Sequence, residues 1–442
     1  MKKIVFAGDS WNKLVADLLM SEIESCAVIQ ANVVANGDKM LASKVHVPTG
    51  GDYVERSTLS AKLKPAFIAP IVKLAVKNKQ ALIFVHTHPE SESPPEFSLT
   101  DDKGEKILNV FLKGRGINVP NAAIVLSKGG CQARILATDS PIQIQQQNKD
   151  FQLIDCFSNQ NGKMINEEFD RQIRAFGEDG QHVIQSLRVG IVGLGGTGSL
   201  VAEQLAYLGV KDFLLIDPDI VEQTNLNRLA GSTLKDIGKS KVDIAKRNIE
   251  KTGKKLVEAV KGSVLETTTA KLLVSTDIFF CCTDSHGSRA VLNQLAYQYL
   301  VPCIDMGVVI NHHKGRIANI TGRIQLLAPG EGCLTCTELL NSDAVRHDLM
   351  TDFERQSDPY FLGDGVVQPS VMSLNATISG LAVSMFLGVV TNIPMNSRYQ
   401  IYDAIKGVIR TVKAKQNSSC IVCSRNGALG RGDEWPLPAR KS

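Results

Sequence analysis

The sequence predicts an α/β protein with two domains, and three observations support this prediction. A glycine-rich turn follows the apolar run Val189 to Val192, as expected where a buried strand leads into a nucleotide-binding helix. Another apolar run, Ala81 to Val85, ends in a different pattern, His86-Thr87-His88-Pro89. The chain has 442 residues, of which 43% are hydrophobic and 5% aromatic, so it is long enough for two ordinary α/β cores.

The polar stretch from Ser140 to Lys163 is the best candidate for a domain boundary, because it contains few large apolar clusters. We expect a first domain over residues 1–140, a linker over 141–163 and a second domain over 164–424. The last residues, 425–442, are rich in Gly, Pro and charge, which is typical of a mobile tail.

Charge and hydropathy exclude some partners. The 49 Lys and Arg residues nearly balance the 45 Asp and Glu residues, and no arginine-rich run is interleaved with aromatics, so we expect no nucleic-acid partner. Met1 to Ser10 indicates a first strand and not a secretion signal. The longest apolar helical stretch, Ile378 to Val390, is broken by glycines and too short to span a bilayer. We therefore expect a cytoplasmic protein with no membrane partner.

The glycine turn predicts a phosphate-binding site. Without a Cβ atom, its glycines let backbone N–H groups approach a phosphate at the start of the next helix. A second apolar strand, Leu214 to Ile216, ends at Asp217, where a ribose hydroxyl would be held. Up to this point NAD and ATP fit equally well. The predicted phosphate-binding glycines are Gly193, Gly195, Gly196 and Gly198.

Polar residues downstream favour ATP. Asn225, Arg228 and Lys241 follow Asp217, and added cations would neutralise a triphosphate, whereas a nicotinamide has no obvious use for them. Asp284, in the sequence CCTDS, comes at the end of the apolar strand Ile278 to Cys282, where open α/β sheets place their ligands. An NAD-dependent dehydrogenase remains the alternative.

From about Glu168 onward the chain resembles the adenylation domain of ubiquitin-activating enzymes and their bacterial relatives ThiF and MoeB. Gly193 to Gly198, Asp217, Asn225, Arg228, Lys241 and CCTDS follow the family's order, and Arg171 in the sequence RQI extends the match upstream. The resemblance implies that Arg228, Lys241 and an Arg171 supplied by the partner of a homodimer neutralise ATP, and that Asp284 is associated with Mg²⁺. The implied reaction adenylates a C-terminal carboxylate, converting a poor electrophile into an acyl-adenylate with a good leaving group.

The cysteines indicate a zinc site. Cys333-x-x-Cys336 and Cys420-x-x-Cys423 have a spacing that lets four thiolates surround one tetrahedral ion. Disulfides are the alternative, and nothing marks the chain as secreted. In the ThiF and MoeB family the same pairs hold a structural Zn²⁺. Cys281, Cys282 and Cys303 lie in or beside apolar runs and indicate packing.

The chain departs from many activating enzymes in one respect, because no cysteine occurs from Thr337 to Ser419. The adenylate would then pass directly to an outside thiol or sulfur donor, as in MoeB-like members. Capture by a hydroxyl such as Ser342 or Thr351 is weaker, since an unactivated hydroxyl is a poor nucleophile. The Gly- and Pro-containing segment from Arg355 to Pro369 is expected to be a crossing loop that guides the partner's tail.

The first domain carries a second candidate metal site. Residues two apart on a strand point the same way, so His86 and His88 can bind one metal, with Asp101 as the third ligand. Three ligands leave zinc a fourth position for water. The alternative is that the histidines are ordinary strand-end residues and that Ser98-Leu99-Thr100-Asp101 only caps a helix.

His86-x-His88-Pro89 followed by Ser98-x-x-Asp101 resembles the signature of JAMM, or MPN-type, metalloproteases, which have a cytidine-deaminase-like α/β fold. The resemblance implies a catalytic Zn²⁺, with Glu24 as general acid/base and Ser98 stabilising the oxyanion. The loop between His88 and Ser98 is longer than the family usually has, and Glu22 competes with Glu24.

Both resemblances concern the C-terminus of a ubiquitin-like protein. They imply a bacterial bifunctional enzyme that cleaves after the terminal glycine of such a partner and adenylates the exposed carboxylate, passing it to a conjugating enzyme or sulfur donor. The alternatives are sulfur-carrier activation for thiocarboxylate-dependent biosynthesis and a non-catalytic scaffold that binds a ubiquitin-like fold.

Overall fold

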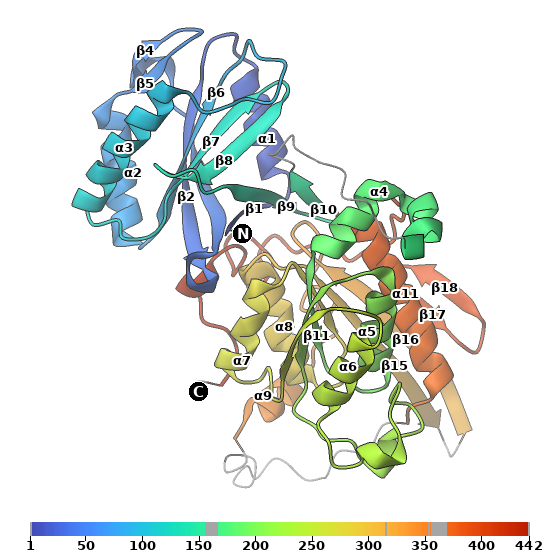
Figure 1. The fold of residues 1–442 in the computed structure, drawn as a ribbon. Helices are drawn as coiled ribbons and strands as arrows, with labels where there is room; N and C mark the ends of the chain where they lie inside the picture. The colour runs from blue at the N-terminus through green and yellow to red at the C-terminus, as the bar shows by residue number, and fades with distance from the viewer. Residues whose placement is uncertain (1, 155–166, 314–315, 352–353, 355–368, 441–442) are drawn as a thin grey trace. The chain divides into compact units, whose positions relative to one another are not determined.

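The structure is a computed structural model that describes residues 2–154, 167–313, 316–351, 354 and 369–440. The chain divides into two compact units (Figure 1). The first contains Met1–Met164 together with Gly430–Trp435, and the second contains Ile165–Leu429 together with Pro436–Ser442. Each unit is built on its own eight-stranded sheet.

The first unit has a mixed sheet of strand order β10-β9-β1-β3-β2-β6-β7-β8. Its elements are β1 (Lys2–Ala7), α1 (Ser10–Leu19), β2 (Cys26–Val34), β3 (Lys39–His46), β4 (Tyr53–Arg56), β5 (Ala61–Leu63), α2 (Pro65–Lys77), β6 (Ala81–Thr87), α3 (Leu99–Gly114), β7 (Ala122–Ser127), β8 (Gly130–Ile135), β9 (Ile142–Gln147) and β10 (Phe151–Ile154). β4 and β5 form a separate hairpin.

Helices cover both faces of this sheet. Leu14 of α1 packs in one core with Ile29 of β2, while Leu112 of α3 packs in a second core with Val28. Because successive side chains of a strand point to opposite faces, the neighbours Val28 and Ile29 belong to different cores. The first unit is therefore a three-layer arrangement of helix, sheet and helix.

The structure does not show the linker that the sequence predicts over residues 141–163. Up to residue 154, this segment contains two strands of the first sheet. β9 pairs in parallel with β1, and β10 pairs in antiparallel with β9. The side chains of Gln146 and Gln147 are buried, and Nε2 of Gln146 donates to Oε1 of Gln152 at 2.8 Å. A polar composition therefore conceals a sheet strand, because the main-chain hydrogen bonds that pair β9 with β1 and β10 need no particular side chains. Residues 155–163 lie outside the described part.

The structure also differs from the prediction of a mobile tail over residues 425–442. Hydrogen bonds hold this segment as far as Arg440. Within the first unit, Nδ2 of Asn32 donates to the carbonyl oxygen of Gly430 at 3.0 Å. Within the second, the amide of Arg440 donates to the carbonyl oxygen of Leu265 at 2.7 Å. Composition indicates a tail here, but main-chain hydrogen bonds need no particular side chains.

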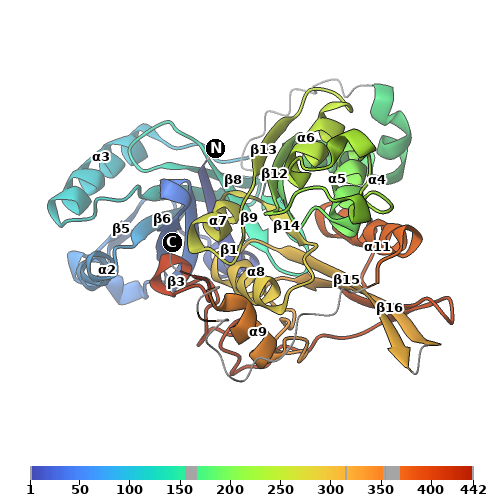
Figure 2. The same ribbon diagram turned by 90° about the horizontal axis from the view of Figure 1, so that it is seen from below.

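The second unit has strand order β13-β12-β11-β14-β15-β16-β17-β18, parallel from β13 to β15 and antiparallel beyond. β15 and β16 project past the parallel strands (Figure 2). The elements are α4 (Asp170–Ser186), β11 (Arg188–Val192), α5 (Gly196–Leu208), β12 (Asp212–Ile216), α6 (Lys241–Glu250), β13 (Leu256–Val260), α7 (Thr267–Leu272), β14 (Ile278–Cys281), α8 (His286–Gln298), β15 (Cys303–His313), β16 (Arg316–Leu327), α9 (Ser342–Leu349), α11 (Met372–Val390), β17 (Tyr399–Asp403) and β18 (Val408–Thr411).

Helix α11 corrects one expectation about the apolar stretch near the C-terminus. It is a continuous helix of 19 residues, long and apolar enough to cross a membrane by length and composition, with a mean hydropathy of 1.6. However, 56% of the most apolar 18-residue stretch of this helix is buried. Oγ of Ser379 also donates to the carbonyl oxygen of Thr197 in α5. The core helix of a globular protein passes the same test. The glycines at 380 and 388 do not interrupt the helix, because flanking residues bury it against α5.

Candidate adenylation and metal sites

A pocket of about 430 Å³ lies at the carboxyl ends of the parallel strands in the second unit. Most of the residues predicted to bind ATP line it. They come from the turn after β11, the loop from the end of β12 to the first residue of α6, and the loop after β14. The predicted residues that line the pocket are Gly193, Gly195, Gly196, Asp217, Arg228, Lys241 and Asp284.

The glycine turn leaves space for a ligand. Gly193 has φ +85°, a left-handed conformation that favours glycine. At Gly198 a Cβ atom would lie 1.8 Å from the carbonyl oxygen of Gly193, so this glycine permits close packing of the turn and does not line the pocket. At Gly195 a Cβ atom would meet nothing within 4 Å. Packing inside the protein therefore does not require a glycine at position 195.

Helix α5 starts at this turn without a side-chain cap and without acidic residues in its first turn. The first N–H groups of a helix lack partners within the helix, and the helix dipole favours negative charge there. The N-terminus of α5 therefore fits a phosphate group.

The acid and the cations are held in place around the pocket. Asp217 is buried, and its carboxylate accepts hydrogen bonds from the amides of Leu194 and Asp219. Burial raises the pKa of Asp217, although those two N–H groups favour its ionised form. Nζ of Lys241 lies 2.7 Å from Oδ2 of Asp219. Nη1 of Arg228 donates to the carbonyl oxygen of Thr224 at 2.6 Å.

Two other predicted residues lie outside the pocket lining. Asn225 ends a short 3-10 helix, and its Oδ1 accepts from the amide of Glu222 at 3.1 Å, so it shapes the loop that presents Arg228. Arg171 is exposed on α4. The role predicted for Arg171 in a partner's site stays a prediction.

Arg289 and Asn375 are among the pocket-lining residues that the sequence did not indicate. Arg289 of α8 donates to the carbonyl oxygens of Asp284 and Met306, and Asn375 of α11 lies against the glycine turn, where a Cβ atom on Gly196 would meet its Nδ2 at 2.2 Å. Arg289 could have been suspected from its place five residues after Asp284. Asn375 carries no local signal, because only the packing of α11 brings it here.

The four paired cysteines form one cluster. Sγ of Cys333 lies 3.6 Å from Sγ of Cys420, and Sγ of Cys336 lies 3.4 Å from Sγ of Cys423. Zn–S bonds of ~2.3 Å in a tetrahedron place sulfurs about 3.8 Å apart, so the cluster fits zinc with little adjustment. A hydrogen bond from Cys423, together with those of the other thiols, lowers the pKa of Cys333 to about 5. The cluster suggests a structural zinc.

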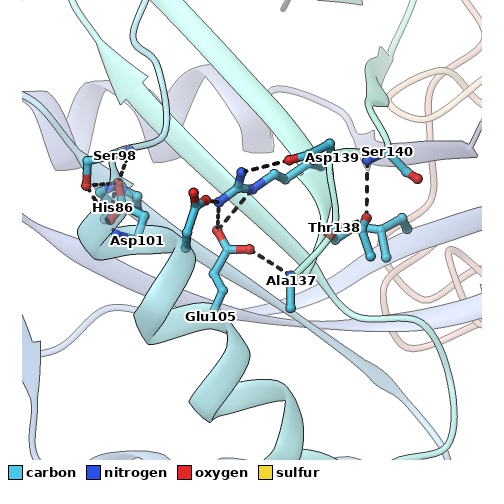
Figure 3. Close-up of polar contacts among 11 residues, drawn as sticks. His86, Ser98, Asp101, Glu105, Ala137, Thr138, Asp139 and Ser140 are labelled. Carbon is cyan, nitrogen blue, oxygen red and sulfur yellow. Dashed lines mark hydrogen bonds and ion pairs between the residues drawn. The ribbon is translucent and has the colours of Figure 1, made fainter.

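In the first unit, the candidate ligands His86, His88 and Asp101 offer atoms within 4.8 Å of one another. His86 is the penultimate residue of β6, and Asp101 lies in the first turn of α3. Oδ1 of Asp101 is 3.3 Å from Nε2 of His86, and this nitrogen is shielded from solvent without a hydrogen bond (Figure 3). Burial, then the neighbouring His86, lowers the pKa of His88, which favours the neutral imidazole that binds metals. These donors fit a zinc ion.

Ser98 holds the third candidate ligand. It is the N-cap of α3, and its Oγ donates to Oδ2 of Asp101 at 2.7 Å, as does its amide. Oδ1 is therefore left to face His86. Burial opposes ionisation of Asp101, but the contacts with His86 and Ser98 outweigh it and hold its pKa below the ordinary value. The capping and ligand interpretations of this segment are thus compatible, and the hydroxyl predicted to stabilise an oxyanion is engaged with Asp101.

Strand pairing brings Glu24 to the same place. β2 and β6 are antiparallel with Cys26 opposite His86, so the chain just before β2 runs beside His88. Glu24 is buried and interacts electrostatically with His86 and Asp101, whereas Glu22 is exposed. Burial raises the pKa of Glu24. The geometry therefore favours Glu24 over Glu22.

The fold and the pocket of the second unit define an ATP-dependent adenylyltransferase with a Rossmann-like sheet. The chain belongs to the ThiF family, whose model matches residues 169–422. Residues before 169, which include most of the first unit, lie outside this match.

Three relatives illustrate the similarity. The molybdopterin-synthase adenylyltransferase of Escherichia coli is 27% identical over 260 residues, which cover 58% of this chain and 96% of that protein. The ubiquitin-like modifier-activating enzyme 5 of Arabidopsis thaliana is 27% identical over 280 residues, 59% of either protein, so the chain spans little more than half of it. The SAMP-activating enzyme E1 of Haloferax volcanii is 26% identical, over 57% of this chain and 85% of that protein.

Solved structures are also similar to this chain. The crystal structure of E. coli MccB with ATP aligns with a TM-score of 0.46 and 20% identity, covering 60% of this chain and 76% of that chain.

Proposed function

We propose that this chain is a bifunctional cytoplasmic enzyme that cleaves after the C-terminal glycine of a ubiquitin-like protein and adenylates the carboxylate so exposed. One observation supports the adenylation activity. In a member of the ThiF family, the same pocket is lined by Gly195, Asp217, Arg228, Lys241 and Asp284. Related proteins named as activating enzymes for ubiquitin-like modifiers and as a molybdopterin-synthase adenylyltransferase support a small protein as substrate.

In the adenylation step, a carboxylate oxygen of the partner attacks the α-phosphorus of ATP. The bond between that phosphorus and the bridging oxygen to the β-phosphorus breaks, and pyrophosphate leaves. Arg228 and Lys241 stabilise the charge that accumulates on the phosphates, while the uncapped start of α5 donates N–H groups. Mg²⁺ bound near Asp284 would supply further charge neutralisation. The sulfur of a conjugating enzyme's thiol or of a sulfur donor then attacks the acyl carbon of the adenylate, a C–S bond forms, the C–O bond to the phosphate breaks, and AMP leaves.

The cluster of His86, His88 and Asp101, with the buried Glu24 beside it, supports a metallopeptidase in the first unit. Zinc held by these three residues would polarise a water molecule and the scissile carbonyl. Glu24 takes the proton of the attacking water and returns it to the leaving amine as the C–N bond breaks. The product of this unit is the substrate of the other.

The experiment uses the full-length protein, zinc, magnesium-ATP and a ubiquitin-like protein encoded beside it that carries residues beyond its terminal glycine. Intact mass should show trimming to glycine and then the mass gain of one AMP. Arg228→Ala and Asp284→Ala should lower adenylation by about 100-fold or more and leave trimming unchanged. Lys246→Ala, on a surface pair with Glu250 at 3.8 Å, is the control that keeps both activities.

Two outcomes would contradict parts of this proposal. Adenylation retained in Arg228→Ala and Asp284→Ala would refute the site assignment, and an untrimmed but adenylated partner would refute the peptidase.

The chain from Thr337 to Ser419 contains no cysteine, which favours a second candidate function, sulfur-carrier activation. Formation of a thiocarboxylate instead of a protein conjugate would establish that route.

The predicted crossing loop at Arg355 to Pro369 lies outside the described residues, except for Pro369, which lines the ATP pocket. Of the two hydroxyls considered as acyl acceptors, Ser342 begins α9 and Thr351 follows it. Oγ1 of Thr351 donates to Oε2 of Glu354 at 2.8 Å. An oxyester on either hydroxyl stays the weaker alternative.

A further inference from the structure

Arg134 of β8 connects to the helix that carries a candidate zinc ligand. Its guanidinium Nη2 lies 2.7 Å from Oδ1 of Asp102 and 2.9 Å from Oε1 of Glu105, and its Nε donates to the same Glu105 oxygen (Figure 3). Both carboxylates belong to the start of α3, where Asp102 directly follows Asp101. Arg134 therefore holds two points on this helix from the edge strand of the sheet.

A third contact lies just before the helix. The guanidinium carbon of Arg134 sits 3.9 Å from the ring centroid of Phe97, and that ring lies 6.2 Å from the ring of His86. Phe97 directly precedes the N-cap Ser98. Arg134 thus contacts the segment that carries Asp101 on both sides of it, by a stacked ring before it and by charge after it.

Charge explains why such a fixation matters. Three carboxylates, Asp101, Asp102 and Glu105, lie within about one turn of the helix, and the Arg134 side chain that faces two of them is only 11% exposed. Removing one partner of a buried charge pair leaves the other uncompensated. Without Arg134, repulsion among the carboxylates would rotate or loosen the first turn of α3, and the aim of Oδ1 of Asp101 at His86 would be lost.

We propose that Arg134 is a positioning residue for the metal site, which it serves by fixing Phe97 and the first turn of α3 so that Asp101 faces His86. This inference rests on the metal site proposed above. Partners beyond the ligands themselves typically contribute about 10- to 100-fold to metal affinity. Arg134 touches neither the ion nor the substrate, so its effect appears in metal affinity before it appears in catalysis.

The test is a Co²⁺ titration of the full-length, metal-free protein followed by its absorption spectrum. Thiolate charge-transfer bands report the four-cysteine site, and visible ligand-field bands without them report the site of His86, His88 and Asp101. Arg134→Met should weaken Co²⁺ binding at the second site by about tenfold or more, with binding at the cysteine site unchanged. Arg134→Lys, which keeps the charge but not the fork and the stack, should be intermediate.

Arg115→Met is the matched control. Arg115 is the C-cap of the same helix and stacks on Phe111 at 5.2 Å, far along the helix from Asp101, so its removal should leave both sites unchanged. Equal Co²⁺ affinity in Arg134→Met and the wild type would overturn this inference while leaving the metal site intact. No cobalt at the His86 site of the wild type would instead refute the proposed peptidase. If Arg134→Met does not fold, Arg134→Lys decides, since unchanged affinity there overturns the inference.

Discussion

At the scale of single residues, burial separates two glutamates that the sequence could not. Glu22 and Glu24 both precede β2, but only Glu24 is buried beside His86 and Asp101. The distinction comes from the antiparallel register of β2 and β6, which places residue 24 beside His88, whereas Glu22 lies in a bend before the strand and faces solvent. A carboxyl group in this position is suited to exchange protons with water and a leaving amine.

Glu24→Gln should lower peptidase activity by about 100-fold or more, while zinc binding persists. Because burial raises the pKa of Glu24, its ionised form is lost as pH falls through a value above that of an ordinary glutamate. In the wild type, kcat/KM should therefore rise with pH through this raised pKa, and the variant should lack that limb. A pH profile of trimming, with Glu22→Gln as the unchanged control, measures this. An unaltered acid limb in Glu24→Gln would assign the base elsewhere.

Asn375, Arg289 and Arg134 show what residue-level reasoning leaves out. Each lies at a site because a distant element packs there, α11 and α8 beside the ATP pocket and β8 beside α3. The sequence around Asn375 and Arg134 gives no pattern that distinguishes them from solvent-facing polar residues, whereas Arg289 comes five residues after Asp284. By contrast, His86-x-His88 and the cysteine pairs could be identified because their ligands lie close together in the sequence.

At the scale of elements, the turn between β11 and α5 contains glycines with different roles. Gly198 permits the close approach of Gly193, whereas Gly195 faces open space. The glycine-rich pattern predicts the turn, but only the structure separates the glycine needed for folding from the glycine that leaves space for phosphate.

Gly198→Ala should lower the free energy of unfolding by about 1–3 kcal/mol, because its Cβ atom would overlap the carbonyl oxygen of Gly193. Gly195→Ala should leave the melting temperature nearly unchanged and weaken ATP binding by about tenfold, or ~1.4 kcal/mol. Thermal unfolding and calorimetric titration with magnesium-ATP distinguish the two variants. Unimpaired ATP binding in Gly195→Ala would mean that the phosphates lie elsewhere.

The cysteine cluster joins two short loops that lie far apart in the sequence. Cys333 and Cys420 come from opposite sides of α11 and β17, so an ion between them closes a long loop. A bound ion would therefore tie the segment after β18 to the loop after β16.

Cys420→Ser should remove one zinc ion per chain and lower the melting temperature of the second unit, because the remaining thiolates no longer complete a tetrahedral shell. Metal content by mass spectrometry and differential scanning calorimetry measure the two effects. Cys131→Ala, which removes a buried thiol from the first unit, should leave this zinc in place. Undiminished zinc content in Cys420→Ser would exclude the four-cysteine site.

At the scale of the whole molecule, the exposed Arg171 bears on assembly. Among the described residues, the ATP pocket of one chain contains Arg228, Lys241 and Arg289 as cations, and Arg171 is not part of its lining. The family resemblance implies that this arginine completes the site of a partner chain. A symmetric homodimer would then contain two sites, each dependent on both chains.

Mixing Arg171→Ala with Lys241→Ala tests this dependence. Each variant alone should be inactive in pyrophosphate exchange. In a mixed dimer, the site with an intact Lys241 receives an intact Arg171 from its partner, so an equimolar mixture should recover about a quarter of the wild-type activity. Arg174→Ala, which loses only a surface pair with Asp170 at 2.8 Å, is the control. Activity that does not recover, or a fully active monomer in sedimentation, would place Arg171 outside the site.

The sequence by itself determined the candidate sites whose parts are local. The glycine turn after β11, the two cysteine pairs and the His86-x-His88 pattern follow from chemistry that needs particular residue types at short spacing. It also indicated that Asp217, Arg228, Lys241 and Asp284 lie at one site, because parallel strands bring successive strand ends to one edge of a sheet.

Only the tertiary structure decided where polar segments pack. The glutamines of β9 and the segment from Gly430 to Trp435 lack the apolar periodicity that identifies a strand or a docked segment, yet hydrogen bonds hold both in the first unit. The same holds for Arg134, whose partners lie about 30 residues away in the sequence. Apolar patterns report burial by the hydrophobic effect, whereas hydrogen-bonded and charged contacts depend on which distant groups the fold brings together.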